Sequence, residues 1–448
     1  MYYYKQNLKN TIFLITFAII VTIFLYSLLV VKNNHLLDTR KIYDLKRNDI
    51  IGKINELEKE VQAERLELNL LRKTIDNLTL QSNYYQSRDT IIPIVVLVCN
   101  RVDALKHLLT KLTRLRPLSK IFPIIVSQDC DSDAIPRMIN ESFRDDVSYI
   151  KHTDPLTDKI DIPSNMYKYK NYYYISRHYK LILDHIFNQL NYETVIILED
   201  DLDISSDFFS YFNATYHQLL KKDQSLYCVS AWNDNGLPDL IDINNFTTLY
   251  RTDFFPGLGW MLTKKLWKEL SQKWPLGFWD DWIRKPEQRK NRMCIRPEIS
   301  RTSMTRYGKS GASKGLLFDA FLSRIKLNDI FVNFENIDLS YLTEEKYEQI
   351  YTKNVYEYAQ NISLDRLKEI INRPVKGVNN FLRVEYSTFK EYQDIAAFLV
   401  IMRDFKEGVG RTAYKGVISV YKNGWRIFIA PNKEKWKGYD SKWEYFPR

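Results

Sequence analysis

The stretch ETVIILEDDLD (residues 193–203) decides the fold class, because a short apolar, β-branched run leads directly into three carboxylates. A continuous apolar run of this length is typical of a strand in a parallel sheet, where both faces are covered. Ligands bind beyond the carboxyl ends of such strands. Glu199, Asp200 and Asp201 therefore stand where a binding site is expected. The alternative to a binding site is an acidic turn that caps the next helix, which is the usual role of an isolated acidic pair.

Four further segments share this apolar character and are predicted as strands or strand ends: IIPIVVLVCNR (91–101), IFPIIVSQDCD (121–131), VSYIKH (147–152) and LYCVSAWNDNG (226–236). A helical pattern follows the first, and another helix is predicted over 176–190. Strands that alternate with helices predict an α/β fold with a mainly parallel sheet. Polar side chains again mark strand ends, at Asn100, Arg101 and Asp129.

Three adjacent carboxylates at one strand end repel one another, so bringing them together generally requires a cation. Carboxylate oxygens are the ligands that Mg²⁺ and Mn²⁺ prefer. An ion at Glu199, Asp200 and Asp201 would stabilise a departing nucleotide diphosphate as a Lewis acid.

The N-terminal part of the 448-residue chain is predicted to lie outside the globular domains. The uncharged run TIFLITFAIIVTIFLYSLLVV (11–31) has the length of a membrane-spanning helix, with residues 1–10 as a cytoplasmic tail. A cleaved signal peptide is the alternative, but its apolar region is usually shorter. Residues 32–90 are predicted as a helical stem, which either pairs with a second copy of the chain or is a solvated spacer.

Two packed domains are predicted after the stem. Residues 91–339 hold the strand and helix alternation, and residues 340–448 form a smaller α+β domain. Within the latter, Asn423-Gly424 between two β-branched, aromatic arms predicts a type I′ hairpin.

Four cysteines lie beyond the apolar run, at Cys99, Cys130, Cys228 and Cys294. An even number in a lumenal domain indicates two disulfides, with three connectivities open, whereas four free thiols would fit a cytosolic domain. Five N-x-S/T motifs agree weakly with a lumenal location. The formal charge of +10 comes without a dense basic run or a nucleic-acid module, so no nucleic-acid partner is expected.

Two more segments have the composition of a reaction site. Trp279-Asp280-Asp281-Trp282 combines aromatic rings on which a sugar could stack with a carboxylate that could take a hydroxyl proton. Buried tryptophans that serve packing alone are the alternative. The loop at 306–318 contains three glycines and is predicted to close over a diphosphate, unless it is an ordinary connection. His178, at the start of the helix predicted over 176–190, could reach a phosphate.

Five stretches together resemble the N-acetylglucosaminyltransferase I family, glycosyltransferase family 13: VSQDCD (126–131), SRHYKLILDHIF (176–187), ILEDDLDISSDFFSYF (197–212), PGLGWML (256–262) and FWDDWIRKPEQRKNRMCIRPEISRT (278–302). The resemblance implies a GT-A fold with a mixed, mainly parallel sheet. It also implies inverting transfer of GlcNAc from UDP-GlcNAc, in β1,2 linkage, to the α1,3-arm mannose of an oligomannose N-glycan. Mn²⁺ is the implied cofactor, with Mg²⁺ as the alternative, and a single-pass type II protein of the Golgi membrane is the implied form.

The resemblance also assigns roles to single residues. It implies contacts to UDP-GlcNAc from Asn100, Arg101, Asp129, His178, Glu199, Asp200 and Ser313. Asp201 resembles the direct metal ligand, and Asp280 resembles the base, with Asp281 as its neighbouring alternative. The implied disulfides are Cys99–Cys130 and Cys228–Cys294. Asn100 departs from the family, which often has Asp there, so altered donor contact is expected.

Two other functions compete with this expectation. A related enzyme class adds β1,2-GlcNAc to O-linked mannose on proteins, but it usually carries an additional carbohydrate-binding module, for which the stem is too short. A catalytically silent membrane lectin or scaffold would have lost the acidic motifs, which are both present here.

Overall fold

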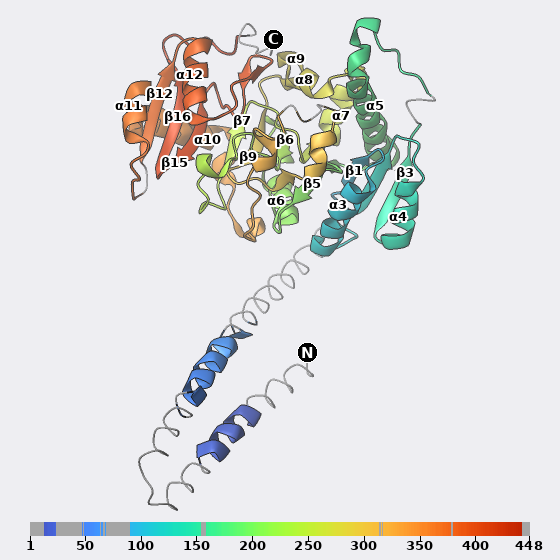
Figure 1. Ribbon diagram of the computed structural model, residues 1–448. Helices are drawn as coiled ribbons and strands as arrows, with labels where there is room; N and C mark the ends of the chain where they lie inside the picture. The colour runs from blue at the N-terminus through green and yellow to red at the C-terminus, as the bar shows by residue number, and fades with distance from the viewer. Residues whose placement is uncertain are drawn as a thin grey trace, which may run out of the picture. The chain divides into compact units, whose positions relative to one another are not determined.

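The computed structural model describes residues 13–23, 47, 49–62, 64–65, 68, 90–153, 158–312, 315, 317–377 and 380–440. The chain divides into two compact units, residues 1–81 and residues 82–448 (Figure 1). In the first unit, residues 13–23 and 49–62 are α-helical. Within the described ranges, no helix has both the length and the apolar character needed to cross a membrane. The remainder of the predicted span 11–31 lies outside the described residues, as does much of the predicted stem.

An eight-stranded sheet organises the second unit, with the strand order β3-β2-β1-β4-β8-β6-β9-β7. Its strands are β1 (Ile94–Val98), β2 (Ile124–Gln128), β3 (Val147–Lys151), β4 (Thr194–Glu199), β6 (Leu226–Ser230), β7 (Leu249–Thr252), β8 (Trp260–Thr263) and β9 (Met293–Pro297). Of these, β8 and β7 run antiparallel to their neighbours, and the remaining pairs are parallel. The expected mixed, mainly parallel α/β sheet is therefore confirmed.

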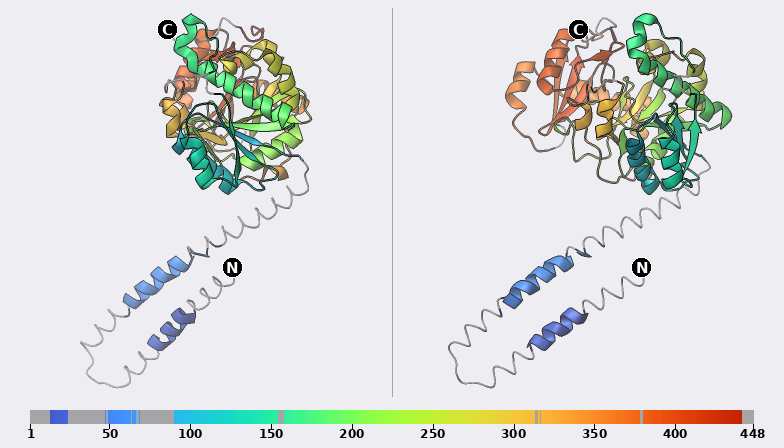
Figure 2. Two further views of the ribbon diagram at one scale, coloured as in Figure 1. Left: turned by 90° about the vertical axis from the view of Figure 1, so that its right-hand side faces the viewer. Right: turned by 45° about the vertical axis from the view of Figure 1, so that its right-hand side comes forward.

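Helices cover both faces of this sheet, as Figure 2 shows. One face packs against α3 (Val102–Leu115), α4 (Ala134–Ser142) and α6 (Phe208–Thr215), and the other against α5 (Lys170–Asp184), α7 (Lys264–Leu270) and α8 (Trp279–Arg284). Side chains along a strand alternate between faces. Accordingly, Val96 of β1 belongs to the first core and its neighbours Val95 and Leu97 to the second. All three are buried, which explains why the sequence run is continuously apolar.

Helix α5 begins earlier than predicted. The sequence pattern suggested residues 176–190, whereas the α-helix spans Lys170–Asp184 and continues as a π-helical turn over His185–Gln189. The buried positions Tyr173, Ser176 and Tyr179 extend the apolar stripe toward the N-terminus at a helical spacing. His178 therefore lies inside the helix, and the expectation that it stands at a helix start was wrong.

The C-terminal part of the unit contains a four-stranded sheet in the order β11-β12-β16-β15. It comprises β11 (Gln360–Asn361), β12 (Phe381–Tyr386), β15 (Ile418–Lys422) and β16 (Trp425–Pro431), with helices α10 (Glu344–Thr352), α11 (Leu364–Ile370) and α12 (Phe389–Leu399). Strands β15 and β16 form the predicted hairpin, because Asn423 and Gly424 have φ of 52° and 88°, as a type I′ turn requires. A Cβ on Gly424 would lie 2.2 Å from the carbonyl oxygen of Val375, so only glycine fits there.

Candidate active site

The ends of β1 and β4 meet because the two strands are parallel neighbours, with Leu97 in register with Glu199. Arg101 follows β1, and its guanidinium donates to both carboxylate oxygens of Asp200. Its Nη1 also donates to Asp201 Oδ2 at 3.0 Å. Asp200 and Asp201 are 2% and 4% exposed, so one arginine balances two buried carboxylates. The sequence-predicted acidic group and Arg101 therefore form one cluster.

Burial and mutual repulsion shift the protonation of this cluster. Burial, followed by the charge of Asp201, raises the pKa of Glu199 to about 7. Burial raises the pKa of Asp200 to about 6, against the opposing effect of Arg101. The hydroxyl of Tyr179, on α5, donates to Glu199 Oε1 at 2.9 Å. A further positive charge in this cluster would favour the ionised carboxylates.

Asp201 has a carboxylate oxygen to offer to such a charge. Its Oδ1 is buried and makes no hydrogen bond within the part of the chain that the structure describes. Its peptide oxygen accepts hydrogen bonds from both the amide and the hydroxyl of Thr305, each at 2.8 Å. An orphaned carboxylate oxygen beside further carboxylates is a donor set that fits a divalent cation such as Mn²⁺ or Mg²⁺.

The predicted loop 306–318 starts against this cluster. Arg101 Nη1 donates to the carbonyl oxygen of Tyr307 at 3.0 Å, and a Cβ on Gly308 would lie 3.5 Å from Asp201 Oδ2. The same Cβ would collide with the Met304 sulfur at 2.4 Å, so glycine allows this close approach. Ser313 lies outside the described residues.

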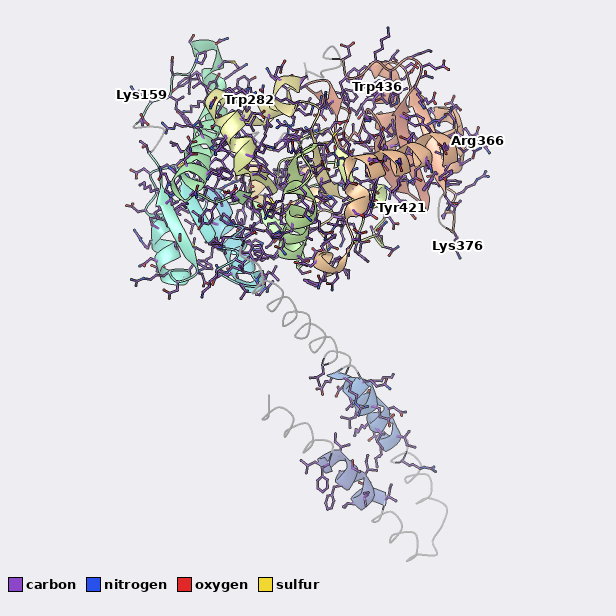
Figure 3. The ribbon with its side chains drawn as sticks, turned by 180° about the vertical axis from the view of Figure 1, so that it is seen from behind. Lys159, Trp282, Arg366, Lys376, Tyr421 and Trp436 are labelled. Atoms are coloured by element: carbon purple, nitrogen blue, oxygen red, sulfur yellow. A yellow bond between two sulfur atoms is a disulfide. The ribbon has the colours of Figure 1, made fainter. Side chains whose placement is uncertain are left out.

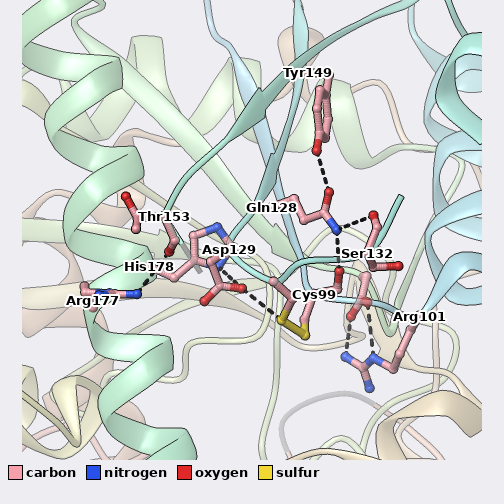
Figure 4. The surroundings of a disulfide bond; sticks show 11 residues. Cys99, Arg101, Gln128, Asp129, Ser132, Tyr149, Thr153, Arg177 and His178 are labelled. Carbon is pink, nitrogen blue, oxygen red and sulfur yellow. Dashed lines mark hydrogen bonds and ion pairs between the residues drawn. A yellow bond between two sulfur atoms is a disulfide. The ribbon is translucent and has the colours of Figure 1, made fainter. Parts of the chain in front are cut away.

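A disulfide holds the ends of β1 and β2 together beside this cluster. The structure contains Cys99–Cys130 and Cys228–Cys294, the pairing that the family resemblance implies. The Gln128 amide donates to the carbonyl oxygens of Cys99 and Ser132 and so braces the same strand ends (Figure 4). Asn100, next to this disulfide, is exposed to solvent.

His178 lies on the other side of Asp129 from the disulfide (Figure 4). Its Nδ1 is 3.4 Å from Asp129 Oδ1, and its Nε2 is 2.8 Å from the Ser127 hydroxyl. Burial lowers the pKa of His178 to about 3, so this imidazole is neutral at physiological pH. A neutral histidine, a serine hydroxyl and a carboxylate can together recognise a polar heterocycle by hydrogen bonding.

Cys99, Asp129 and Cys130 also place possible ligand atoms within 4.8 Å of one another. Both sulfurs belong to the Cys99–Cys130 disulfide, however, and a disulfide has no thiolate to offer a metal. This group is therefore not a metal centre.

The second acidic pair lies at the start of α8, after Phe278, whose φ of 53° turns the chain into the helix. Asp280 and Asp281 have side chains that are 41% and 33% exposed. Arg284 Nη1 donates to Asp280 Oδ2 at 3.0 Å and to Asp281 Oδ1 at 2.9 Å. Lys406, from the hairpin β13 (Phe405–Lys406) and β14 (Val409–Gly410), lies 3.6 Å from Asp281 Oδ1. Asp280 is thus the less paired of the two carboxylates.

The tryptophans beside this pair pack against other aromatic rings. Trp279 is only 6% exposed, and its ring stacks on Trp260 with the centroids 5.7 Å apart. Trp282 packs edge-on against Trp274. For Trp279 the alternative of a tryptophan buried for packing is therefore confirmed, because the first turn of α8 directs it into the core.

Tyr179 connects the two acidic sites. Its hydroxyl contacts Glu199, and its ring lies 4.2 Å, centroid to centroid, from that of Trp279 next to Asp280. Sequence reasoning overlooked Tyr179, Arg284, Ser127 and Lys406. Only Arg284 carried a local signal, because it follows Asp280 by four residues and Asp281 by three on a helix.

The GNT-I family model matches residues 9–443. The chain belongs to the GNT-I family. A curated relative is the alpha-1,3-mannosyl-glycoprotein 2-beta-N-acetylglucosaminyltransferase of Arabidopsis thaliana. The two sequences are 35% identical over 375 residues, which cover 84% of this chain and 81% of the relative.

Two solved structures are similar to part of this chain at low identity. S. aureus TarS is 12% identical, with 48% of this chain and 60% of that chain covered and a TM-score of 0.34. Glucosyl-3-phosphoglycerate synthase from Mycobacterium tuberculosis is 11% identical, with 54% and 82% covered and a TM-score of 0.33. The assignment to the GNT-I family rests on the sequence match and not on these two structures.

Proposed function

We propose that this chain transfers GlcNAc from UDP-GlcNAc, in β1,2 linkage, to the α1,3-arm mannose of an oligomannose N-glycan, with inversion at the transferred carbon. The observation that carries the proposal is the match to the GNT-I family over residues 9–443. The name of the 35% identical relative describes this reaction class. Both acidic groups that the chemistry needs are present in the fold, one at a strand end and one on α8.

The donor is held at the strand ends in this proposal. Arg101, which also pairs with Asp200 and Asp201, contacts the donor, while Asp129 and neutral His178 bind the uracil and ribose by hydrogen bonds. Glu199 and Asp200 contact the donor sugar and the ribose. Asn100, at the exposed end of β1, adds an amide in place of a carboxylate and so contributes no charge to the donor site.

Asp201 is the proposed metal ligand, through the Oδ1 that has no hydrogen-bond partner among the described residues. When bound there, Mn²⁺, or Mg²⁺ in its place, supplies Lewis-acid stabilisation of the diphosphate charge that develops as UDP departs. Arg101 keeps the neighbouring Asp200 and Asp201 together, so that Asp201 presents this oxygen in a fixed position.

Asp280 is the proposed base. It takes the proton from the acceptor mannose hydroxyl as that oxygen attacks the sugar carbon from the face opposite UDP, which gives inversion. Arg284 restrains the orientation of the Asp280 carboxylate, which remains 41% exposed and open to an acceptor. Asp281 has two cationic neighbours, Arg284 and Lys406, and these favour a structural role for it.

The segment 306–318 is proposed to close over the bound donor, with Ser313 contacting the diphosphate. The start of this segment already packs against Arg101 and Asp201 through Tyr307 and Gly308. Closure would exclude water from the donor and limit its hydrolysis.

We also propose where in the cell this chain is located. The apolar run 11–31 anchors the chain in the Golgi membrane as a single-pass type II protein, with the catalytic part in the lumen. The stem is proposed to pair two copies of the chain, because Ile50 and Leu57, seven residues apart on its described helix, are both more than 40% exposed.

The full chain in detergent, with UDP-GlcNAc and Mn²⁺, tests the function. An oligomannose N-glycan and an O-mannosyl peptide are offered in parallel and are analysed by mass spectrometry. One HexNAc on the N-glycan alone is the expected result. Transfer to the peptide alone would assign the chain to the O-mannose enzymes, and donor binding without any transfer would indicate a silent scaffold.

A further inference from the structure

A cavity lies apart from the two acidic groups, between the outer edge of the large sheet and the C-terminal part of the unit. Its volume is about 400 Å³, within the range of roughly 300–1,000 Å³ that is usual for small-molecule sites. Strand β7 contributes to it from one side, and α10, β15 and β16 from the other. Neither Asp201 nor Asp280 lines it. Figure 3 shows Tyr421, one of its lining residues, from behind.

Aromatic rings from several elements line this cavity. Among the lining residues are Tyr250 of β7, Tyr351 of α10, Phe381 of β12 and Tyr421 of β15. The ring of Tyr351 packs edge-on against that of Phe428, and so does the ring of Phe381. Fixed tyrosine rings offer an apolar face and a polar tip at the same place. A pyranose has the complementary surface, with C–H groups on its faces and hydroxyls on its edge.

The charges around the cavity favour a neutral ligand. Arg426 lines it, but its Nη2 donates to Glu298 Oε1 at 2.9 Å, and Glu298 is 2% exposed. The guanidinium carbon also lies 5.2 Å from the centroid of the Tyr421 ring. Asp242 is a further lining residue, and its negative charge opposes anion binding. A phosphate or nucleotide would therefore have to compete with Glu298 for the cation and approach Asp242.

The lining of this cavity has hydroxyl groups that could form hydrogen bonds with a ligand. The hydroxyls of the lining residues Tyr250 and Tyr421 make no hydrogen bond to another residue in the part of the chain that the structure describes. Such groups suit a ligand that carries several hydroxyls of its own.

We propose that this cavity binds a neutral oligosaccharide, and that its occupant during catalysis is a mannose branch other than the one that reacts. The choice of occupant rests on the proposed function, whereas saccharide binding itself does not. The site would retain branched acceptors through a second contact, which raises the effective concentration of the reacting arm.

The test compares the full chain with Tyr421→Ala and with the control Tyr358→Ala, which removes a 63% exposed tyrosine outside the cavity. Calorimetry measures the binding of α-mannobiose, and kinetics compare an oligomannose N-glycan with methyl α-mannoside. We expect Tyr421→Ala to weaken mannobiose binding about 3- to 10-fold. The KM for the branched acceptor should rise by a similar factor, while the KM values for UDP-GlcNAc and methyl α-mannoside stay unchanged.

The outcomes separate this inference from the proposed function. Weakened mannobiose binding with an unchanged KM for the branched acceptor would keep the saccharide site and assign its ligand to another glycan. Weakened binding in a chain that transfers no GlcNAc would keep the site and sink the proposed function. Equal binding and equal KM values in all three chains would overturn the inference. If Tyr421→Ala does not fold, photo-crosslinking of a diazirine mannobiose to the unmodified chain should label peptides that contain residues 341–354 or 418–428, and labelling elsewhere would refute the site.

Discussion

The two acidic groups of the proposed active site are built in opposite ways. At the end of β4, Asp200 and Asp201 are nearly fully buried, and Arg101 pairs with both. On α8, Asp280 and Asp281 retain 41% and 33% of their side-chain exposure. The proposed donor side thus holds its charges in place before any ligand arrives, whereas the proposed acceptor side keeps its carboxylates in contact with solvent.

This difference fits the two kinds of chemistry. Stabilising a leaving diphosphate needs charges that do not reorganise during the reaction, and burial provides this at a cost in desolvation. The burial that raises the pKa of Glu199 to about 7 is one sign of that cost. A base, in contrast, has to exchange its proton with solvent after each turnover, so exposure suits the role that we propose for Asp280.

The largest effect should come from removing the donor-side metal ligand. Asp201→Asn keeps the size of the side chain but weakens the proposed ligand, and we expect transfer to fall about 10³-fold or more, since Lewis-acid help is worth several kcal/mol. The matched control is Asp203→Asn, which alters a carboxylate paired with Lys111. Steady-state rates and Mn²⁺ titrations of thermal stability measure both variants. Full activity in Asp201→Asn would place the metal elsewhere.

On the acceptor side, the comparison predicts unequal roles for two neighbours. Asp280→Asn should lower kcat about 10²-fold or more, because a general base typically contributes that much. Asp281→Asn, with Arg284 and Lys406 as neighbours, should lower it less than about 10-fold. Donor binding, measured by calorimetry with UDP, should be equal in both variants. The reverse order of the two kcat values would assign the base to Asp281.

The sequence predicted the surroundings of the acidic group at the end of β4 better than those of the acidic group on α8. The strands β1, β2, β4 and β6 were recognisable because buried parallel strands are continuously apolar, and their ends fixed the position of Arg101 and Glu199. The turn at Asn423-Gly424 was equally clear, since its backbone needs two residues with positive φ.

The surroundings of the base were harder to predict. Which face of α8 is buried depends on packing against Trp260 and Tyr179, and no local pattern in a helix of 6 residues reveals it. The sequence therefore left two alternatives open for Trp279, a sugar-stacking ring or a buried one, and the structure shows the buried one. Lys406 comes from a remote hairpin, and only tertiary structure brings it to Asp281. Sequence thus predicts what one strand or one turn determines, and misses what two distant segments share.

Removing the hydrogen bond from Tyr179, which lies between the two acidic groups, should have a smaller effect. Tyr179→Phe removes the hydroxyl that donates to Glu199 but retains the ring beside Trp279. A hydrogen bond to a charged group contributes about 1.5–3 kcal/mol, so we expect the KM for UDP-GlcNAc to rise about 10-fold or more. The kcat at saturating donor should change much less, because Asp280 and its partner Arg284 are untouched. A fall in kcat alone would indicate that Tyr179 acts on the acceptor side.

The smallest effect concerns stability in mild acid, and it also belongs to the buried donor side. Burial lowers the pKa of His178 to about 3, against about 6.5 in an unfolded chain. Below pH 6.5 the unfolded state therefore binds a proton that the folded state does not, and stability falls as the pH decreases toward 3. Between pH 7 and pH 5.5 this histidine should cost about 1 kcal/mol. Denaturant unfolding of the full chain and of His178→Asn at both pH values measures the contribution of His178, and the decrease in stability should be smaller in the variant. Equal decreases would mean that folding does not lower the pKa of His178. A larger decrease in the variant would mean that His178 is protonated in the fold and that its contact with Asp129 is an ion pair.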